Sequence, residues 1–361
     1  MQKDAWETVL PTDMKKNFFY LSFLRVVGCV AVVVLHLAAS ETLIYQDVLT
    51  ESQTFGMTLV YNLMMWAVPV FVMVSGALLL DPEKDITIHK IFTTYIKRIL
   101  IALVSFSLIF RIFDMVMDHE AFTISGILKG LLDAFTGNGW SHMWYLYLII
   151  GLYLILPAMR AVTKNRPVKE LKYLLIVGFV VISVLPLTRL FGISSSFYIH
   201  VNTIYPVYFL LGYMLHKDII RIDRRVAAAL MVIGAAGIVC GTYFGLKGSI
   251  QNPTVLTGYA SPFVAFLASG IFFLSKDIKE PTEKMKSIVL SIDRCSFGIY
   301  LIHMVFVRLL LRYLQVNLFD YPIWLSVPIS AVFIFSVSLV LVYVYCRIIP
   351  DSKYIDHSQS N

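Results

Sequence analysis

Charged residues are scarce in this chain, and no stretch between its apolar runs is long enough to fold as a separate soluble domain. Only 15% of the 361 residues are Asp, Glu, Lys or Arg, whereas 58% are hydrophobic. Apolar runs of about 20 residues recur too often for the cores of soluble domains. Because open sheets and irregular backbone cannot face lipid, the composition predicts an all-α polytopic membrane bundle.

Sequence motifs of many soluble enzymes are also missing. The chain contains no P-loop, no dinucleotide-binding glycine pattern, no H-E-x-x-H, no G-x-S-x-G and no His-x4-Asp box. Its four cysteines lack C-x-x-C or zinc-ligand spacing, so we interpret them as small buried hydrophobic residues. We therefore expect no permanently bound cofactor and no metal. The net charge of +7 could suggest nucleic acid as a partner, but the charges lie in alternate loops instead of one patch.

The apolar runs predict about ten membrane spans of roughly 20 residues each. Lys and Arg concentrate in the N-terminal segment, in the loops after the second, fourth, sixth and eighth spans, and in the C-terminal tail, while the intervening loops contain few of them. By the positive-inside rule, the basic loops and both termini are predicted to be cytoplasmic. The spans are predicted at 18–39, 57–80, 95–117, 142–162, 171–190, 200–216, 226–246, 256–275, 295–314 and 322–347.

This assignment divides the chain into a cytoplasmic segment at 1–17, a membrane domain at 18–347 and a cytoplasmic tail at 348–361. The first apolar run is expected to remain as a span, because it is longer than the apolar core of a signal peptide and Arg25 interrupts it. The outward segment 118–141 contains an amphipathic stretch, which we expect to lie flat at the outer surface or to dip inward.

The first span carries two polar residues, Arg25 and His36. They are eleven positions apart, so both project from one helix face, about 16 Å apart along the axis. Ionisable groups at membrane depth are costly and usually mark a pathway or a site. A neutral imidazole accepts a proton, which makes His36 a candidate general base, while Arg25 is a candidate to bind an anion or a carbonyl. The alternative is an interfacial histidine beside a snorkelling arginine.

Cations and small residues in the second and third spans can be explained by structural roles as well as by functional ones. Lys97 and Arg98 lie at the inner mouth of the third span, where adjacent cations can hold a phosphate or simply anchor the helix. Ser75 and Gly76 allow close helix approach and, taken alone, predict packing.

Polar residues of the later spans are similarly ambiguous. Trp144 and Tyr145 fit an aromatic belt at the outer interface. An aromatic belt does not explain His142 beside them, but a single histidine is only weak evidence of a functional role. Tyr300 and His303 share a face near the midplane, where a hydrogen bond to a neighbouring helix would satisfy the histidine.

A further polar pair lies within the third span. Arg111 and Asp114 are one turn apart and are expected to pair with each other.

The order of the segments resembles the acyltransferase-3 family of membrane-bound O-acyltransferases. FLRVVGCVAVVVLH, PVFVMVSGALLL, YIKRIL, HMWYLYLIIGLYLILP and SFGIYLIH follow one another as in that family, from about residue 18 to 347. Within the family, the branch that O-acetylates cell-surface polysaccharides, such as enterobacterial common antigen, is the most similar.

The resemblance implies a ten-helix bundle in a bacterial inner membrane that transfers an acyl group, most simply acetyl, from cytoplasmic acyl-CoA to a hydroxyl of a surface polysaccharide or lipid-linked glycan. It implies that Arg25 and His36 are the essential pair, with His36 as the base or the acyl carrier. It also implies that Lys97 and Arg98 bind the CoA phosphates. Family motifs with a substrate-binding role fall on Ser75, Trp144, Tyr145, Tyr300 and His303.

Two other function classes stay open from the residues alone. In a transporter or a flippase for a lipid-linked sugar, the polar stripe of the first span would line a pathway; an inverted repeat with discontinuous helices would favour it, and the sequence shows neither. In a membrane scaffold or sensor, the buried charges would be only structural.

Overall fold

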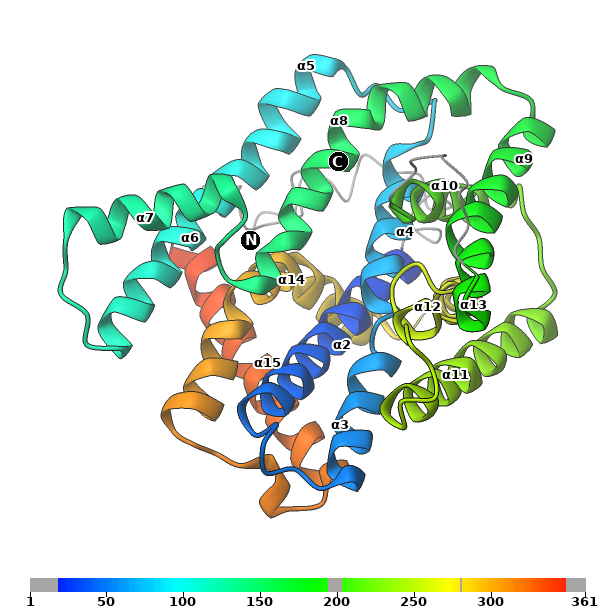
Figure 1. Ribbon diagram of the computed structural model, residues 1–361. Helices are drawn as coiled ribbons and strands as arrows, with labels where there is room; N and C mark the ends of the chain where they lie inside the picture. The colour runs from blue at the N-terminus through cyan, green and yellow to red at the C-terminus, as the bar shows by residue number, and fades with distance from the viewer. Residues whose placement is uncertain (1–18, 194–202, 280, 349–361) are drawn as a thin grey trace.

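The computed structural model describes residues 19–193, 203–279 and 281–348 (Figure 1). Every regular element in these ranges is helical, and nine of the helical segments are long and apolar enough to cross a membrane. The predicted all-α polytopic bundle is therefore confirmed. The predicted segment 1–17 lies outside the described residues, and so does the predicted tail after residue 348.

The helices follow the predicted spans, with local interruptions. In chain order they are α2 (Phe19–Ile44), α3 (Glu51–Leu63), α4 (Ala67–Leu79), α5 (Ile88–Lys90), the π-helical η1 (Ile91–Ile96), α6 (Lys97–Met117), α7 (Ile124–Thr136), the 3-10 turn η2 (Ser141–Met143), α8 (Trp144–Asn165), α9 (Val168–Phe179), the π-helical η3 (Val180–Val184), the 3-10 η4 (Leu185–Phe191), α10 (Tyr205–His216), α11 (Arg224–Leu246), α12 (Thr254–Thr257), α13 (Pro262–Ser275), α14 (Glu283–Arg308), the π-helical η5 (Leu309–Tyr313), the 3-10 η6 (Leu318–Asp320) and α15 (Ile323–Ile348).

The second predicted span is divided by a turn at 64–66, which separates α3 from α4. Pro69 lies in the first turn of α4 and has no N–H to donate, so a continuous helix would lose a hydrogen bond here. Helix α3 begins at Glu51, earlier than the predicted start of the span at residue 57, because Thr50 and Gln53 form a reciprocal capping box there.

Helices α2 and α14 pack side by side in the same direction. Arg25 of α2 pairs with Asp293 of α14. Farther along both helices, His36 of α2 meets His303 of α14. Two parallel spans need an odd number of crossings between them, and six of the nine candidate spans in the described residues lie between these two. Counting the shorter helix α10 as a crossing makes their number odd, so the ten predicted spans are compatible with the nine candidates found in the described residues.

A second close helix pair, α4 and α10, supports the same topology. Gly76 and Gly212 let the two backbones touch, because a Cβ atom on either glycine would overlap a carbonyl group of the other helix. Asp81 and Lys217, which follow the two helices, form an ion pair of 2.6 Å. Burial raises the pKa of Asp81, but the hydrogen bonds from Lys217 and from the backbone of Glu83, together with the charges of Lys217 and Lys84, outweigh burial and keep that pKa below its usual value.

Loops predicted on one side of the membrane are joined to one another. Arg160 donates to the carbonyl oxygens of Leu79 and Asp81 at 2.6 and 2.7 Å, which links two loops of the basic set. At the opposite end, Lys247 pairs with Glu51 at 2.8 Å and links two loops of the other set. The two loop sets thus lie at opposite ends of the bundle. Which end is cytoplasmic stays a prediction from charge.

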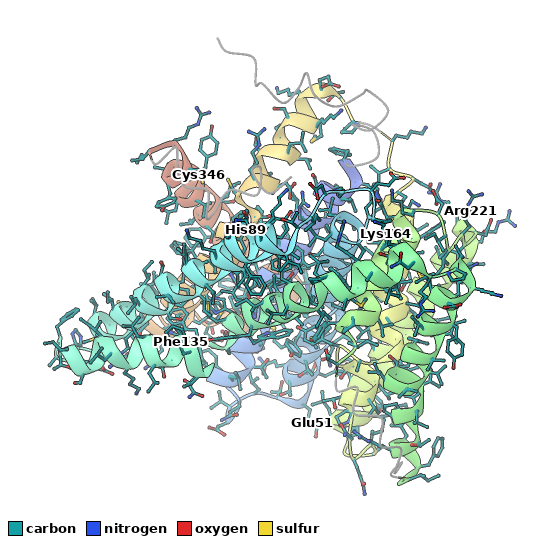
Figure 2. All side chains as sticks on the ribbon, turned by 90° about the horizontal axis from the view of Figure 1, so that it is seen from above. Glu51, His89, Phe135, Lys164, Arg221 and Cys346 are labelled. Atoms are coloured by element: carbon teal, nitrogen blue, oxygen red, sulfur yellow. The ribbon has the colours of Figure 1, made fainter. Side chains whose placement is uncertain are left out.

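The outward segment 118–141 folds back along α6. Helix α7 runs antiparallel to α6, with Gly126 against Met115 and Gly130 against Arg111. Its other face is apolar and exposed, and Figure 2 shows Phe135 on the arm that projects from the bundle. The chain therefore re-enters the protein before α8 begins.

Candidate active site

The contact between α2 and α14, here called the α2–α14 seam, contains a buried ion pair. The Nε and Nη2 atoms of Arg25 donate to the two carboxylate oxygens of Asp293 at 2.6 and 2.5 Å. The side chain of Arg25 is 20% exposed and that of Asp293 only 7%. The fork of Arg25, predicted to bind an anion or a carbonyl, is therefore occupied by Asp293 in this structure.

Asp293 is a polar residue that sequence reasoning missed. The ninth span was predicted to begin at residue 295, whereas α14 begins at Glu283, so Asp293 was assigned to a loop. The connection 276–294 contains three other acidic residues, so the sequence offered no signal that distinguished Asp293.

The second polar contact of the seam joins His36 to His303. Their Nδ1 and Nε2 atoms, respectively, are 3.0 Å apart. The Nδ1 atom of His303 lies 2.7 Å from the carbonyl oxygen of Tyr300 and 3.2 Å from that of Ile299. Because a carbonyl only accepts hydrogen bonds, this Nδ1 carries the proton of a neutral His303, and its Nε2 is an acceptor.

These contacts determine the tautomer of His36 when both rings are neutral. Its Nδ1–H must donate to Nε2 of His303, so the other ring nitrogen, Nε2, keeps a lone pair. His36 is half-buried, whereas His303 is completely buried. His36, the more exposed of the two histidines, is therefore also the one with a ring nitrogen, Nε2, available for proton or acyl transfer.

His142 joins this pair as a third histidine. Its ring centroid is 6.1 Å from that of His36 and 5.5 Å from that of His303. The hydroxyl of Tyr300 donates to the backbone carbonyl of His142. His142 is 0% exposed, so it lies inside the bundle and not on its surface, because the fold-back of α7 carries the start of α8 into the bundle.

Trp140 and Arg308 clamp the segment that carries His142. One face of the Trp140 ring stacks on Phe110 at a centroid distance of 4.2 Å. The guanidinium of Arg308 lies 3.8 Å from the centroid of the same ring. Asp114 accepts hydrogen bonds from both the Trp140 indole and Arg308, at 2.8 and 2.7 Å.

The predicted pairing of Arg111 with Asp114 is therefore wrong. Arg111 donates instead to Glu120 at 2.6 Å and to the backbone of Gly126 at 3.2 Å. Tertiary partners from α14 and the α6–α7 connection have replaced the local pair, because they reach both charges in better geometry than neighbours on one helix do.

The structure separates Lys97 from Arg98. They are adjacent on a helix, so their side chains point about 100° apart. Lys97 is exposed, whereas Arg98 is only 9% exposed. The guanidinium of Arg98 lies 5.3 Å from the ring centroid of Phe297, one turn of α14 from Asp293. Only Arg98 thus approaches the α2–α14 seam.

Tyr145 and Trp144 extend the site as an aromatic cluster. The ring of Tyr145 lies 5.4 Å from that of Tyr300, next to the histidines. Trp144 packs 5.4 Å from the ring of Tyr259. Ser75 does not share in this cluster through its hydroxyl, which donates to the backbone of Phe71 in its own helix at 2.9 Å.

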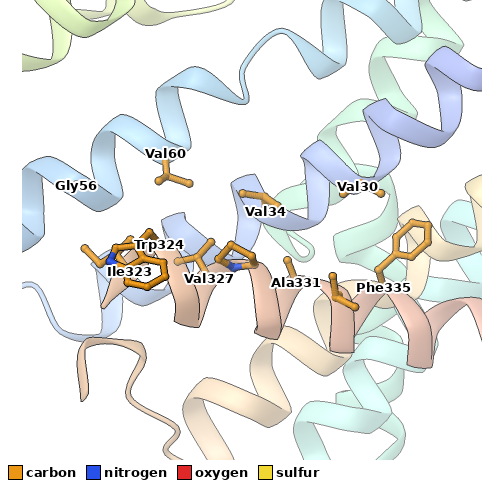
Figure 3. Close-up of a pocket in the computed structure, with 11 residues that line it drawn as sticks. Val30, Val34, Gly56, Val60, Ile323, Trp324, Val327, Ala331 and Phe335 are labelled. Carbon is orange, nitrogen blue, oxygen red and sulfur yellow. The ribbon is translucent and has the colours of Figure 1, made fainter. Parts of the chain in front are cut away.

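An apolar groove of 580 Å³ lies on another face of α2, between α3 and α15 (Figure 3). Val34, which lines it, is two positions before His36, so the groove is on nearly the opposite face of the helix from the histidines. It offers no reacting group, because its lining residues are all apolar: Val30, Val34, Gly56, Val60, Ile323, Trp324, Val327, Pro328, Ala331, Val332 and Phe335.

A comparison with protein families identifies the chain. Residues 18–346 match a family described as an acyltransferase domain. The chain belongs to this acyltransferase family. The match covers both helices of the seam, and it confirms the predicted resemblance at the level of the family. For this acyltransferase, comparisons with curated proteins and with solved structures found no significant match.

Proposed function

We propose that the protein is an integral membrane O-acyltransferase of a bacterial inner membrane. It moves an acyl group, acetyl in the simplest case, from cytoplasmic acyl-CoA to a hydroxyl of a surface polysaccharide or a lipid-linked glycan. One observation carries the proposal: the Nε2 lone pair that the contact with His303 leaves on His36, inside a chain whose family is acyltransferases.

The seam places polar groups at two depths of the bundle, which shortens the distance between substrates on the two sides of the membrane. Acyl-CoA is charged and does not cross a bilayer, while the acceptor hydroxyl lies outside. From Asp293 to His303 the seam spans ten residues of α14, or about 15 Å. It joins a charged inner part at Arg25 to a neutral outer part at His36.

The inner part of the seam would receive the CoA phosphates. Arg25 and Arg98 flank α14 within one turn of each other, with one carboxylate, Asp293, between them. Guanidinium groups bind phosphates through paired, charge-assisted hydrogen bonds, so this part of the seam favours an anion. Lys97 is exposed near the same helix end and would add a weaker, solvent-screened attraction.

His36 can act in either of two ways. As a base, its Nε2 takes the proton of the acceptor hydroxyl while the hydroxyl oxygen attacks the thioester carbonyl; the C–S bond breaks, and the CoA sulfur leaves with the electron pair and then takes up that proton. As a carrier, Nε2 attacks the carbonyl first and CoA thiolate leaves. The hydroxyl oxygen then attacks the acyl-imidazole, the C–N bond breaks, and the hydroxyl proton is released to solvent, which balances the proton that the thiolate takes up. Both versions require the Nε2 lone pair, and Tyr145, Tyr300 and Trp144 would form the aromatic wall of the acceptor site.

The rival proposal is a transporter or flippase for a lipid-linked sugar, in which no bond is made. The interruptions of the second span and of the α12–α13 segment favour it, because discontinuous helices are typical of transporters. The family match favours the transferase.

The test uses purified, detergent-solubilised protein with radiolabelled acetyl-CoA. Wild type is compared with His36→Ala and with His89→Ala, a matched control at an exposed histidine of α5 (Figure 2). We expect thioester consumption in wild type and the control and none in His36→Ala, with equal melting temperatures. Full activity of His36→Ala would refute the site, and no turnover of acetyl-CoA or longer acyl-CoAs by wild type would refute the transferase.

A further inference from the structure

His142 contains a buried hydrogen-bonding atom that the protein itself does not satisfy. Its Nδ1 atom is inaccessible and has no hydrogen-bond partner within the described part of the chain. Buried polar atoms are nearly always paired, because an unpaired one has lost its contact with water without replacement. This atom has no partner, and it belongs to a ring that packs against those of His36 and His303.

The chemistry of this atom follows from the other ring nitrogen. Nε2 of His142 lies 3.3 Å from the carbonyl oxygen of Leu301, which can only accept a hydrogen bond. Nε2 therefore carries the proton of the neutral ring, and Nδ1 has a lone pair. A ligand that satisfies Nδ1 must donate a hydrogen bond. A hydroxyl group does so, whereas a thioester carbonyl or a phosphate oxygen does not.

The rings of His36 and His142 lie close enough for one small molecule to span them. Their centroids are 6.1 Å apart and their planes are inclined at 75°. Two hydroxyl groups on neighbouring carbon atoms can bridge such a separation with hydrogen bonds of ordinary length, about 2.8 Å. Each ring then accepts one hydrogen bond, His36 through Nε2 and His142 through Nδ1.

The fold holds His142 rigidly enough for this role. The backbone carbonyl of His142 accepts a hydrogen bond from Tyr300 on α14, and the preceding Trp140 is clamped between Phe110 and Arg308. The position of the ring relative to His36 is therefore set by contacts with two other helices rather than by the loop alone.

We propose that Nδ1 of His142 binds the acyl acceptor, by accepting a hydrogen bond from the hydroxyl next to the one that is acylated. His36 accepts a hydrogen bond from the attacking hydroxyl, and His142 accepts one from the neighbouring hydroxyl. The site therefore selects acceptors with hydroxyls on adjacent carbons, as in most sugars. The proposal rests on the proposed acyltransferase function and holds for either role of His36.

The test measures the choice between two small acceptors, ethylene glycol and ethanol, offered together to the purified protein with radiolabelled acetyl-CoA. The ratio of the two esters, corrected for the number of hydroxyls, does not depend on the overall rate. It is measured in wild type, His142→Asn and His142→Leu. Asn keeps an acceptor oxygen near the position of Nδ1, and Leu has the same shape without it.

We expect wild type to favour ethylene glycol by about tenfold, the worth of one hydrogen bond in a dry site. His142→Asn should keep most of that preference, and His142→Leu should lower the ratio to near one. A wild-type ratio near one would overturn the proposal, and so would equal ratios in the Asn and Leu variants. If wild type turns over no acyl-CoA at all, the proposed function fails and this inference fails with it; turnover with the wrong ratios removes only the role of His142.

Discussion

The Nδ1 atom of His36 lies 3.0 Å from Nε2 of His303, although the two residues are 267 positions apart in the chain. The contact joins the first span to the ninth. His303 has both nitrogens occupied, one by backbone carbonyls and one by His36, so it has no atom left for a substrate. The interpretation of His303 as substrate-binding is therefore less well supported than a positioning role.

A substitution of His303 should lower the turnover of the proposed reaction without changing substrate affinity. Loss of the acceptor for the Nδ1–H of His36 frees this ring to rotate and to change tautomer, so we expect His303→Ala to lower kcat by about 100-fold. His303→Gln, whose side-chain oxygen can lie near the position of Nε2, should recover at least about tenfold of that loss. Steady-state kinetics with acetyl-CoA measure both values. A purely structural role would predict equal defects in Ala and Gln, together with lower melting temperatures.

The pair Arg25–Asp293 should behave differently when one or both charges are removed. Asp293→Leu leaves a buried guanidinium without its partner, and we expect a loss of about 3–5 kcal/mol in unfolding free energy. The double variant Arg25→Leu with Asp293→Leu should recover most of the stability. It should not recover acetyl transfer if Arg25 also acts on the substrate.

The measurement is thermal unfolding in detergent, combined with the acetyl-CoA assay on the same samples. Glu170→Leu is the matched control, because Glu170 belongs to an exposed ion pair with Arg166 and should change stability by less than about 1 kcal/mol. Recovery of both stability and transfer in the double variant would show that the pair is only structural.

Lys97 and Arg98 should contribute unequally to acyl-CoA binding. Arg98 is buried beside the seam and Lys97 is exposed, so a phosphate contact is stronger at Arg98 and more screened at Lys97. We expect Arg98→Gln to raise the KM for acetyl-CoA by about tenfold or more, and Lys97→Gln by less than about threefold. Equal effects would support the predicted action of the two residues as a pair, and a larger effect at Lys97 would contradict the assignment.

The histidine cluster shows where sequence reasoning succeeded and where it stopped. His36 and His303 were both identified as candidates, because each is a polar residue within an apolar run. Their contact was not predicted, since spacing within one helix says nothing about which helix lies beside it. His142 was assigned to the outer interface because a span was assumed to begin at the membrane surface, whereas α8 begins after the chain has folded back into the bundle.

The sequence by itself determined that this chain is a multi-pass helical membrane protein and which residues stand out as polar within the spans. Hydropathy and loop charge are local properties, and partition between lipid and water acts on each segment separately. The tertiary structure alone decided that Arg25 is held by Asp293, that Asp114 belongs to Arg308 instead of Arg111, and that three histidines meet. Those outcomes depend on which helices pack together, and in lipid that choice comes from close packing and polar contacts between distant segments.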